Sequence, residues 1–115
     1  MRKFAIGLAV MLVAGTAIAG RVGGPMSNRD TVLAYSSDTY SVTFQGRETA
    51  QILVAGDGSS DLDCAAYDNN GNLVALDNDS TDTCLLLWMP AWTGKFRVVV
   101  RNMGDTDNEY SIRSN

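Results

Sequence analysis

The feature that most constrains the fold is the pattern of apolar segments in residues 20–115, which are short and separated by turn-forming residues. None of them repeats with a helical period, whereas several alternate apolar with polar residues or are rich in β-branched and aromatic side chains. The predicted strands are residues 31–35, 39–44, 51–55, 62–67, 73–76, 84–89, 96–101 and 109–113. About eight strands at this spacing predict an all-β protein, either an antiparallel sandwich or a barrel.

Two segments predict more detail. In residues 96–101 the apolar side chains at even positions should face the core, while Arg97 and Arg101 should face solvent. The run Cys84–Met89 is apolar on both faces, so it is either a central strand or a strand with an exposed apolar face. Asn70 and Gly71 both tolerate positive φ, and they predict a type I′ hairpin between strands 62–67 and 73–76.

The N-terminus has the pattern of a secretory signal peptide. A charged start precedes an apolar run at residues 4–14 and the small-residue motif Ala17-Ile18-Ala19, which predicts cleavage before Gly20. The alternative is a retained membrane anchor, although the apolar run is short for a bilayer. We therefore predict a signal peptide at 1–19, a glycine-rich flexible leader at 20–30 and a β-sandwich domain at 31–115.

Net charge limits the choice of partners. After removal of residues 1–19, seven basic residues remain against thirteen acidic ones, a net charge of −6. Such a surface argues against nucleic acid as a partner, and against membrane binding once the signal is cleaved. The expected location is the periplasm or the extracellular space.

Cys64 and Cys84 are the two cysteines. In an exported chain an even cysteine count predicts a disulfide, with buried free thiols as the alternative. Closing a loop of this length should stabilise the fold by about 3 kcal/mol in the chain-entropy model. Two cysteines and no histidine are too few for a zinc site.

The composition argues against catalysis. The absence of histidine removes the commonest general base and every Ser-His or Cys-His pair. Lys95 is the one lysine outside the signal peptide, and it lies on a strand with alternating exposure. We predict that the protein is not an enzyme.

Aspartates are concentrated between residues 57 and 82, and no Lys or Arg occurs between Arg47 and Lys95. Turn chemistry is one interpretation, because Asp and Asn side chains bind nearby backbone groups in turns. Calcium binding is the other, since Ca²⁺ takes six to eight oxygen ligands. The candidate calcium ligands are Asp61, Asp63, Asp77, Asp79 and Asp82.

Trp88 and Trp92 flank Pro90 in the segment Trp88-Met89-Pro90-Ala91-Trp92. Exposed tryptophans offer rigid, amphipathic area for sugars or proline-rich chains, so both are candidate binding residues. In the alternative interpretation, Trp88 ends a strand inside the core and Trp92 covers one end of the sandwich.

Three motifs resemble the bacterial pre-peptidase C-terminal domain. The block 60–75, SDLDCAAYDNNGNLVA, is similar to that family's DLDL-type strand, tyrosine–aspartate pair and NG hairpin. Residues 93–100 resemble its "aGtYyvrV" strand, and residues 108–112 its closing "gsYtL" strand. The similarity covers roughly residues 35–115. This chain differs in its two cysteines, in the Trp88–Trp92 segment and in carrying no protease domain.

The resemblance implies a β-sandwich of jelly-roll type that is usually attached to secreted proteases. Some related domains bind collagen and some bind calcium, and an acidic-site role would fall first on Asp61 and Asp63. We therefore expect a secreted or periplasmic binding or accessory module for an extracellular polymer or a protein, with calcium as the one candidate cofactor. The alternatives are an envelope assembly component that pairs through residues 84–92, and a regulator of a separate secreted protease.

Overall fold

The computed structural model describes residues 20–115, so the predicted signal peptide at 1–19 lies outside the described residues. Eight antiparallel strands form two four-stranded sheets. The strands are β1 (Met26–Val32), β2 (Ser37–Phe44), β3 (Ala50–Ala55), β4 (Leu62–Tyr67), β5 (Leu73–Asp77), β6 (Thr83–Trp88), β7 (Gly94–Asn102) and β8 (Asn108–Ser114). The described residues contain no helix that could span a membrane.

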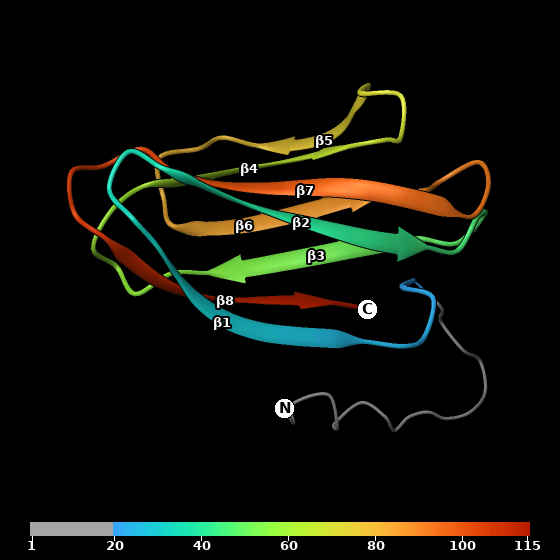
Figure 1. Cartoon of the computed structure of the whole chain (residues 1–115), viewed down its shortest axis with the longest axis horizontal. Helices are drawn as coiled ribbons and strands as arrows, with labels where there is room; N and C mark the ends of the chain where they lie inside the picture. The colour runs from blue at the N-terminus through green and yellow to red at the C-terminus, as the bar shows by residue number, and fades with distance from the viewer. Residues whose placement is uncertain (1–19) are drawn as a thin grey trace.

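Strand pairing defines a jelly roll. One sheet has the order β1-β8-β3-β6 and the other β2-β7-β4-β5. Strands that are distant in sequence therefore pair, β1 with β8, β2 with β7 and β3 with β6, and the β4–β5 hairpin completes the arrangement. This is an antiparallel ribbon wound into two facing sheets (Figure 1). The predicted all-β jelly-roll sandwich is confirmed.

The core lies between the sheets and follows the period-two pattern of the strands. In β7 the even-numbered residues from Phe96 to Asn102 are buried, while Lys95, Arg97 and Arg101 are exposed, as predicted. The largest fully buried apolar side chains are Tyr110, Phe44, Ile52, Leu62, Leu86, Ile112, Val32, Val54, Val98 and Val100. Each sheet contributes to this list, so neither sheet can bury its apolar face without the other.

The first strand differs from the prediction. It was expected at residues 31–35, but β1 spans Met26–Val32 and pairs with β8 along its whole length. Residues 26–30, assigned above to the leader, are thus part of the sheet, and that assignment is wrong for them. The reason is that β1 is an edge strand: of its seven residues only Val32 is buried, so its sequence lacks the apolar alternation that marks a strand.

The hairpin between β4 and β5 forms as predicted, but its turn is of a different type. Gly71 has φ +86, whereas Asn70 is not among the residues with positive φ, so the turn is not type I′. The Gly71 amide donates to the Asp68 carbonyl, and the Asp68 carboxylate accepts from the amides of Asn70 and Asn72. The Asp68 side chain thus selects a wider turn with a single left-handed glycine.

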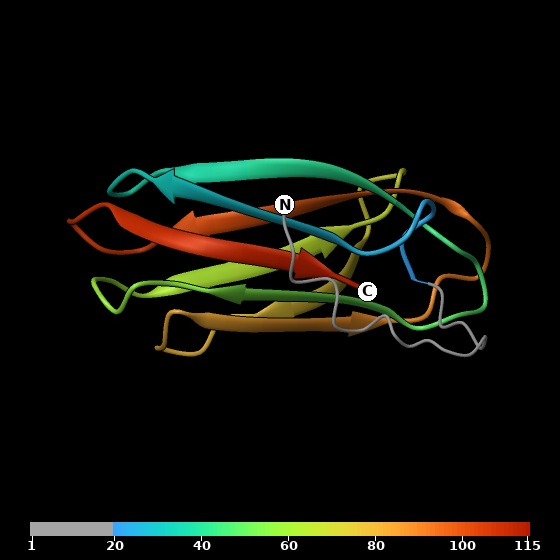
Figure 2. The ribbon, with the colours of Figure 1, turned by 90° about the horizontal axis from the view of Figure 1, so that it is seen from below.

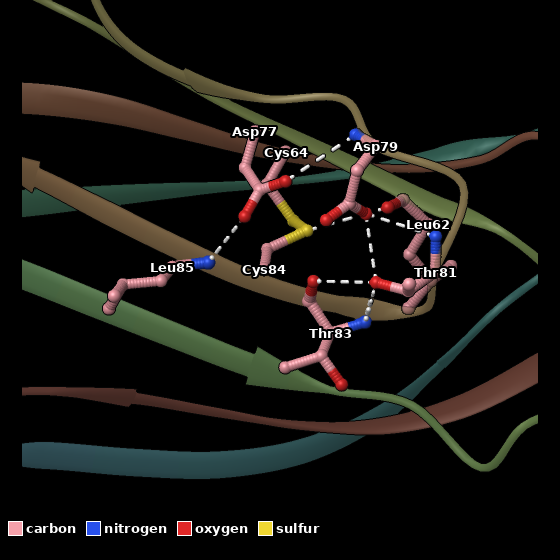
Figure 3. Close-up of a disulfide and its surroundings, with 8 residues drawn as sticks. All are labelled: Leu62, Cys64, Asp77, Asp79, Thr81, Thr83, Cys84 and Leu85. Carbon is pink, nitrogen blue, oxygen red and sulfur yellow. Dashed lines mark hydrogen bonds between the residues drawn. A yellow bond between two sulfur atoms is a disulfide. The ribbon is translucent and has the colours of Figure 1, made fainter.

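The disulfide links the two sheets. Cys64 of β4 and Cys84 of β6 are bonded, their Cα atoms lie 6.1 Å apart, and both are buried. β4 and β6 belong to different sheets, so the bond holds the layers together beside the β5 and β6 edges (Figure 3). The predicted disulfide is confirmed.

The loops gather at the two ends of the long axis. The β1–β2, β3–β4, β5–β6 and β7–β8 loops lie at the left end of Figure 1, which we call the acidic end. The β2–β3, β4–β5 and β6–β7 loops lie at the right end, which we call the tryptophan end. Figure 2 shows the same separation from below.

Candidate functional site

Several aspartates of the acidic end accept hydrogen bonds from backbone amides, both of their own loops and of neighbouring segments. The Asp57 carboxylate accepts hydrogen bonds from the Ser59 hydroxyl and from the amides of Ser59 and Glu109. These bonds, led by the one from Ser59, hold the pKa of Asp57 below its usual value. Asp107 accepts from the Ala34 amide in the same way. These carboxylates therefore connect neighbouring loops, as the turn-chemistry interpretation expects.

Asp77 and Asp79 lie beside the disulfide (Figure 3). The Asp77 carboxylate accepts from the Leu85 amide at 2.9 Å, which joins the edge of β5 to the edge of β6. The Asp79 carboxylate accepts from the amide and hydroxyl of Thr81, and these bonds lower the pKa of Asp79. Both side chains are thus hydrogen-bonded within the β5–β6 connection.

Two buried asparagines organise the acidic end, and the sequence analysis missed both. Asn102 donates to the carbonyls of Val32 and Thr106 and accepts from the Gly104 amide. Asn108 accepts from the Asp57 amide and donates to the Ser60 carbonyl, at 3.0 and 3.2 Å. Their positions could have revealed them, because both asparagines stand at inward-facing positions at the ends of apolar strands. A buried side-chain amide there needs hydrogen-bond partners, and the neighbouring loops supply them.

Asp82 joins this network, because its carboxylate accepts from the Gly58 amide and from the Asn108 side chain. Asp61 and Asp63 differ from it, since each has one solvent-inaccessible carboxylate oxygen without a hydrogen-bond partner. Burial, followed by the charges of Asp61, Asp79 and Asp77, raises the pKa of Asp63.

The predicted calcium ligands are therefore not assembled as one site. Within residues 20–115 no group of three or more His, Cys, Asp or Glu side chains is arranged to hold a metal ion. Of the five predicted ligands, Asp77, Asp79 and Asp82 bind backbone amides, and only Asp61 and Asp63 retain an unpartnered buried oxygen. Calcium binding stays a prediction.

The two tryptophans have different environments. The Trp88 ring packs against Phe44 and Phe96, with ring centroids 5.1 and 5.4 Å away. It is partly buried against the core, and its indole nitrogen is buried without a partner. Trp92 is 80% exposed. The structure thus places Trp88 in an aromatic cluster and Trp92 at the surface of the tryptophan end.

The backbone around Trp92 is fixed although its side chain is free. The Gly46 amide donates to the Thr93 hydroxyl at 3.0 Å, and the Arg47 amide donates to the Pro90 carbonyl at 2.7 Å. A Cβ atom at Gly46 would overlap the backbone of Trp92, so only glycine permits this approach. The β2–β3 loop therefore supports the β6–β7 loop and presents Trp92 on a rigid base.

A tyrosine network links strands β2 and β8, and no pattern in the sequence predicts it. The Tyr110 hydroxyl donates to the Asp38 carboxylate at 2.6 Å and lies 2.6 Å from the Tyr40 hydroxyl. Burial, reinforced by hydrogen bonds to Asp38 and Tyr40, raises the pKa of Tyr110. Burial also raises the pKa of Tyr40, so both hydroxyls stay protonated at neutral pH. The network provides polar partners inside the sandwich, beside the open β1 and β2 edges.

Comparisons with solved structures support the fold. The pre-peptidase C-terminal domain of a collagenase from Bacillus anthracis matches with a TM-score of 0.62 and 14% identity over 78% of this chain and 88% of that one. PliG from Aeromonas hydrophila, a periplasmic inhibitor of g-type lysozyme, matches with a TM-score of 0.57 and 14% identity over 89% and 91% of the two chains. The Yersinia pseudotuberculosis-derived mitogen matches with a TM-score of 0.52 and 10% identity over 80% and 85%.

No protein-family model matches the chain, and neither does any curated protein sequence. The structural matches therefore establish the class by fold: the chain is a small jelly-roll β-sandwich similar to the pre-peptidase C-terminal domain. The resemblance inferred from the three motifs is confirmed at the level of the fold. At these identities a shared fold does not transfer a ligand or an activity.

Proposed function

We propose that this protein is a small, non-catalytic binding or accessory module that acts in the periplasm or outside the cell. One observation carries the proposal: Trp92 is 80% exposed while the loop that bears it is held by hydrogen bonds from Gly46 and Arg47. A large side chain on a rigid base loses little conformational entropy on binding, which is why tryptophan is frequent at binding hot spots. The partner is an extracellular polymer or a protein.

The test is a binding assay against insoluble extracellular polymers, namely cellulose, chitin, peptidoglycan and collagen. Trp92→Ala should weaken binding to the preferred polymer by about tenfold or more, as expected for a hot-spot tryptophan. Tyr35→Ala is the matched control, because Tyr35 is an aromatic residue 71% exposed at the acidic end. Equal affinities for Trp92→Ala and the unmodified protein would contradict a role for this loop.

Export is the second part of the proposal. The disulfide between Cys64 and Cys84 supports it, since such bonds persist in oxidising compartments. Mass spectrometry of the protein from a periplasmic or culture fraction should show an N-terminus at Gly20. A cytoplasmic protein that retains Met1 would contradict this location.

An assembly component of the envelope is the first alternative, supported by the exposed apolar residues Leu85, Leu87 and Met89 on and after the edge strand β6. Pairing through the β6 backbone is restricted, because the amides of Thr83 and Leu85 already donate to Thr81 and Asp77 side chains. A multimer in sedimentation, dispersed by Leu85→Ser with Leu87→Ser, would favour this role. A monomer would favour the binding module.

Regulation of a separate secreted enzyme is the second alternative. The fold is shared with a collagenase domain and with a lysozyme inhibitor, and these likenesses are its support. A stoichiometric loss of activity of a co-secreted protease, or of g-type lysozyme, on addition of this protein would favour it.

Calcium is proposed as a stabiliser at Asp61 and Asp63, because each has a carboxylate oxygen without a hydrogen-bond partner that a cation would satisfy. Added calcium should raise the melting temperature above that in chelator, and Asp61→Asn with Asp63→Asn should abolish the difference. Equal melting temperatures in the two buffers would remove calcium from the proposal.

A further inference from the structure

The outer face of the β2-β7-β4-β5 sheet carries a stripe of positive charge on an acidic protein. Lys95, Arg97 and Arg101 alternate with buried residues along β7, and all three are exposed. At the usual rise of a strand they span about 20 Å. They are three of the seven basic residues outside the signal peptide, so basic charge is concentrated on this one face while most loop aspartates lie at the acidic end.

A row of hydroxyl groups runs beside this stripe. On the neighbouring strand β2, Ser41 pairs with Arg97, Thr43 with Lys95 and Ser37 with Arg101. Thr39 completes the row opposite Val99. The outward side chains of β2 are thus all Ser or Thr, and no carboxylate on that strand faces the cations across the pair.

The cations are available to a ligand. Within the described part of the chain no carboxylate forms a salt bridge with Lys95, Arg97 or Arg101. The Arg97 guanidinium lies 4.7 Å above the Tyr67 ring, which orients it without neutralising it. Asp63 is paired in register with Arg101, and the charge of Asp61 lies close to Asp63, so the Lys95 and Arg97 half of the stripe is the more positive.

The geometry argues against a peptide as the occupant. β7 lies between β2 and β4, so its backbone groups are paired and no extended segment can add to the sheet there. On β7 itself the only apolar outward side chain is Val99, which is partly buried, and the exposed Leu73 and Leu76 lie two strands away on β5, so the stripe offers a protein partner no large apolar anchor of its own. A hydrated chain that carries both carboxylates and hydroxyls matches the cations and the hydroxyl row.

We infer that the outer face of β2 and β7 binds a linear acidic polysaccharide, with its carboxylates at Lys95 and Arg97 and its hydroxyls against Ser41 and Thr43. The protein as a whole is negative, so the attraction must come from the positive charge of this face alone. This inference rests on the proposed function as a binding module, but it uses a different surface from Trp92.

The test measures the affinity of the purified protein for polygalacturonate by calorimetry, with dextran as the neutral polymer and poly-glutamate as the acidic polypeptide. We expect the protein to bind polygalacturonate but neither dextran nor poly-glutamate. This binding should weaken when the salt concentration rises from about 50 to about 300 mM, because the Debye length shortens. Arg97→Gln should lower the affinity about fivefold, and the combined Lys95→Gln, Arg97→Gln and Arg101→Gln variant by more than about tenfold.

Arg29→Gln is the matched control, since Arg29 is an exposed strand residue on the other sheet and the variant has the same net charge as Arg97→Gln. It should change the affinity less than about twofold. An equal loss for Arg29→Gln, no binding of polygalacturonate at the lower salt, or equally tight binding of poly-glutamate would each overturn the inference. If Trp92→Ala abolishes binding to another polymer while the combined Lys95→Gln, Arg97→Gln and Arg101→Gln variant leaves the affinity for polygalacturonate unchanged, the inference fails and the proposed function stands.

Discussion

The two ends of the sandwich use their loop side chains in opposite ways. At the acidic end, Asp57, Asp82 and Asp107 accept hydrogen bonds from backbone amides outside their own loops. At the tryptophan end, the β2–β3 and β6–β7 loops are joined by bonds from the Gly46 and Arg47 amides, and the largest side chain stays exposed.

The difference shows that polar loop side chains can be part of the fold while an apolar loop side chain stays outside it. A carboxylate that accepts two or three backbone amides is part of the fold, because its removal leaves donors unpaired. Trp92 is 80% exposed and contributes little to the fold by contact with the core, so its removal should leave no group of the core unpaired. A dense group of acidic residues is therefore a weaker sign of a binding site here than one exposed tryptophan.

The largest expected effect is at the base of the tryptophan end. Trp88→Ala should destabilise the protein by about 3 to 4 kcal/mol, because the ring packs against Phe44 and Phe96 in the core. Chemical denaturation measures the change. Trp92→Ala is the matched control and should lie within about 0.5 kcal/mol of the unmodified protein. Similar losses for both variants would show that Trp92 is structural, and the contrast between the ends would disappear.

Next in size is the disulfide beside the acidic end. Replacing both Cys64 and Cys84 by alanine should cost about 3 kcal/mol, since the bond closes a loop with a sequence separation of 20 residues and joins the two sheets. The comparison of denaturation curves in the oxidised protein and the double variant gives the value. A cost below about 1 kcal/mol would mean that the sheets are held without it.

The asparagine network should have an intermediate effect. Asn102→Ala should cost about 2 kcal/mol, because it leaves the carbonyls of Val32 and Thr106 and the amide of Gly104 without their partner. Hydrogen exchange should also speed up in the β7–β8 loop and spare the β2–β3 loop. Uniform acceleration at both ends would contradict the separate stabilisation of the two loop groups.

The smallest effect is electrostatic and has opposite signs at two aspartates. The pKa of Asp63 is raised, so its charged form opposes folding above that pKa, and Asp63→Asn should stabilise the protein at pH 7 by less than about 0.5 kcal/mol, since the carboxylate is partly exposed. This gain should vanish as the pH falls below the pKa of an unfolded aspartate. Melting temperatures between pH 7 and pH 3 measure it.

Asp57→Asn is the counterpart, because the pKa of Asp57 is lowered. Its charged form stabilises the fold above the unfolded pKa, and that contribution is lost as the pH falls through the folded pKa. The variant should therefore be less stable at pH 7 and approach the unmodified protein in acid. If both substitutions changed the stability at pH 7 in the same direction, the contrast between the hydrogen-bonded Asp57 and the partly buried, charge-repelled Asp63 would be contradicted.

Much of the fold could be predicted from the sequence, and less of the candidate site. Alternation in residues 96–101 predicts which side chains of β7 are buried, because side chains of a strand point to opposite faces. The edge strand β1 was misplaced, since its pairing with β8 depends on backbone bonds that any residue can make. The predicted turn type at Asn70 and Gly71 was wrong, because hydrogen bonds to the Asp68 side chain override the preference of this pair for a type I′ turn.

The sequence by itself determined the all-β class, the strands after the first and the disulfide, because hydrophobic period, turn residues and cysteine count act locally or by simple pairing. Only the tertiary structure decided that Trp88 is packed and Trp92 exposed, that the loop aspartates bind amides, and that three cations of β7 face a row of β2 hydroxyls. These features join segments far apart in the chain, and the winding of the two sheets alone brings them together.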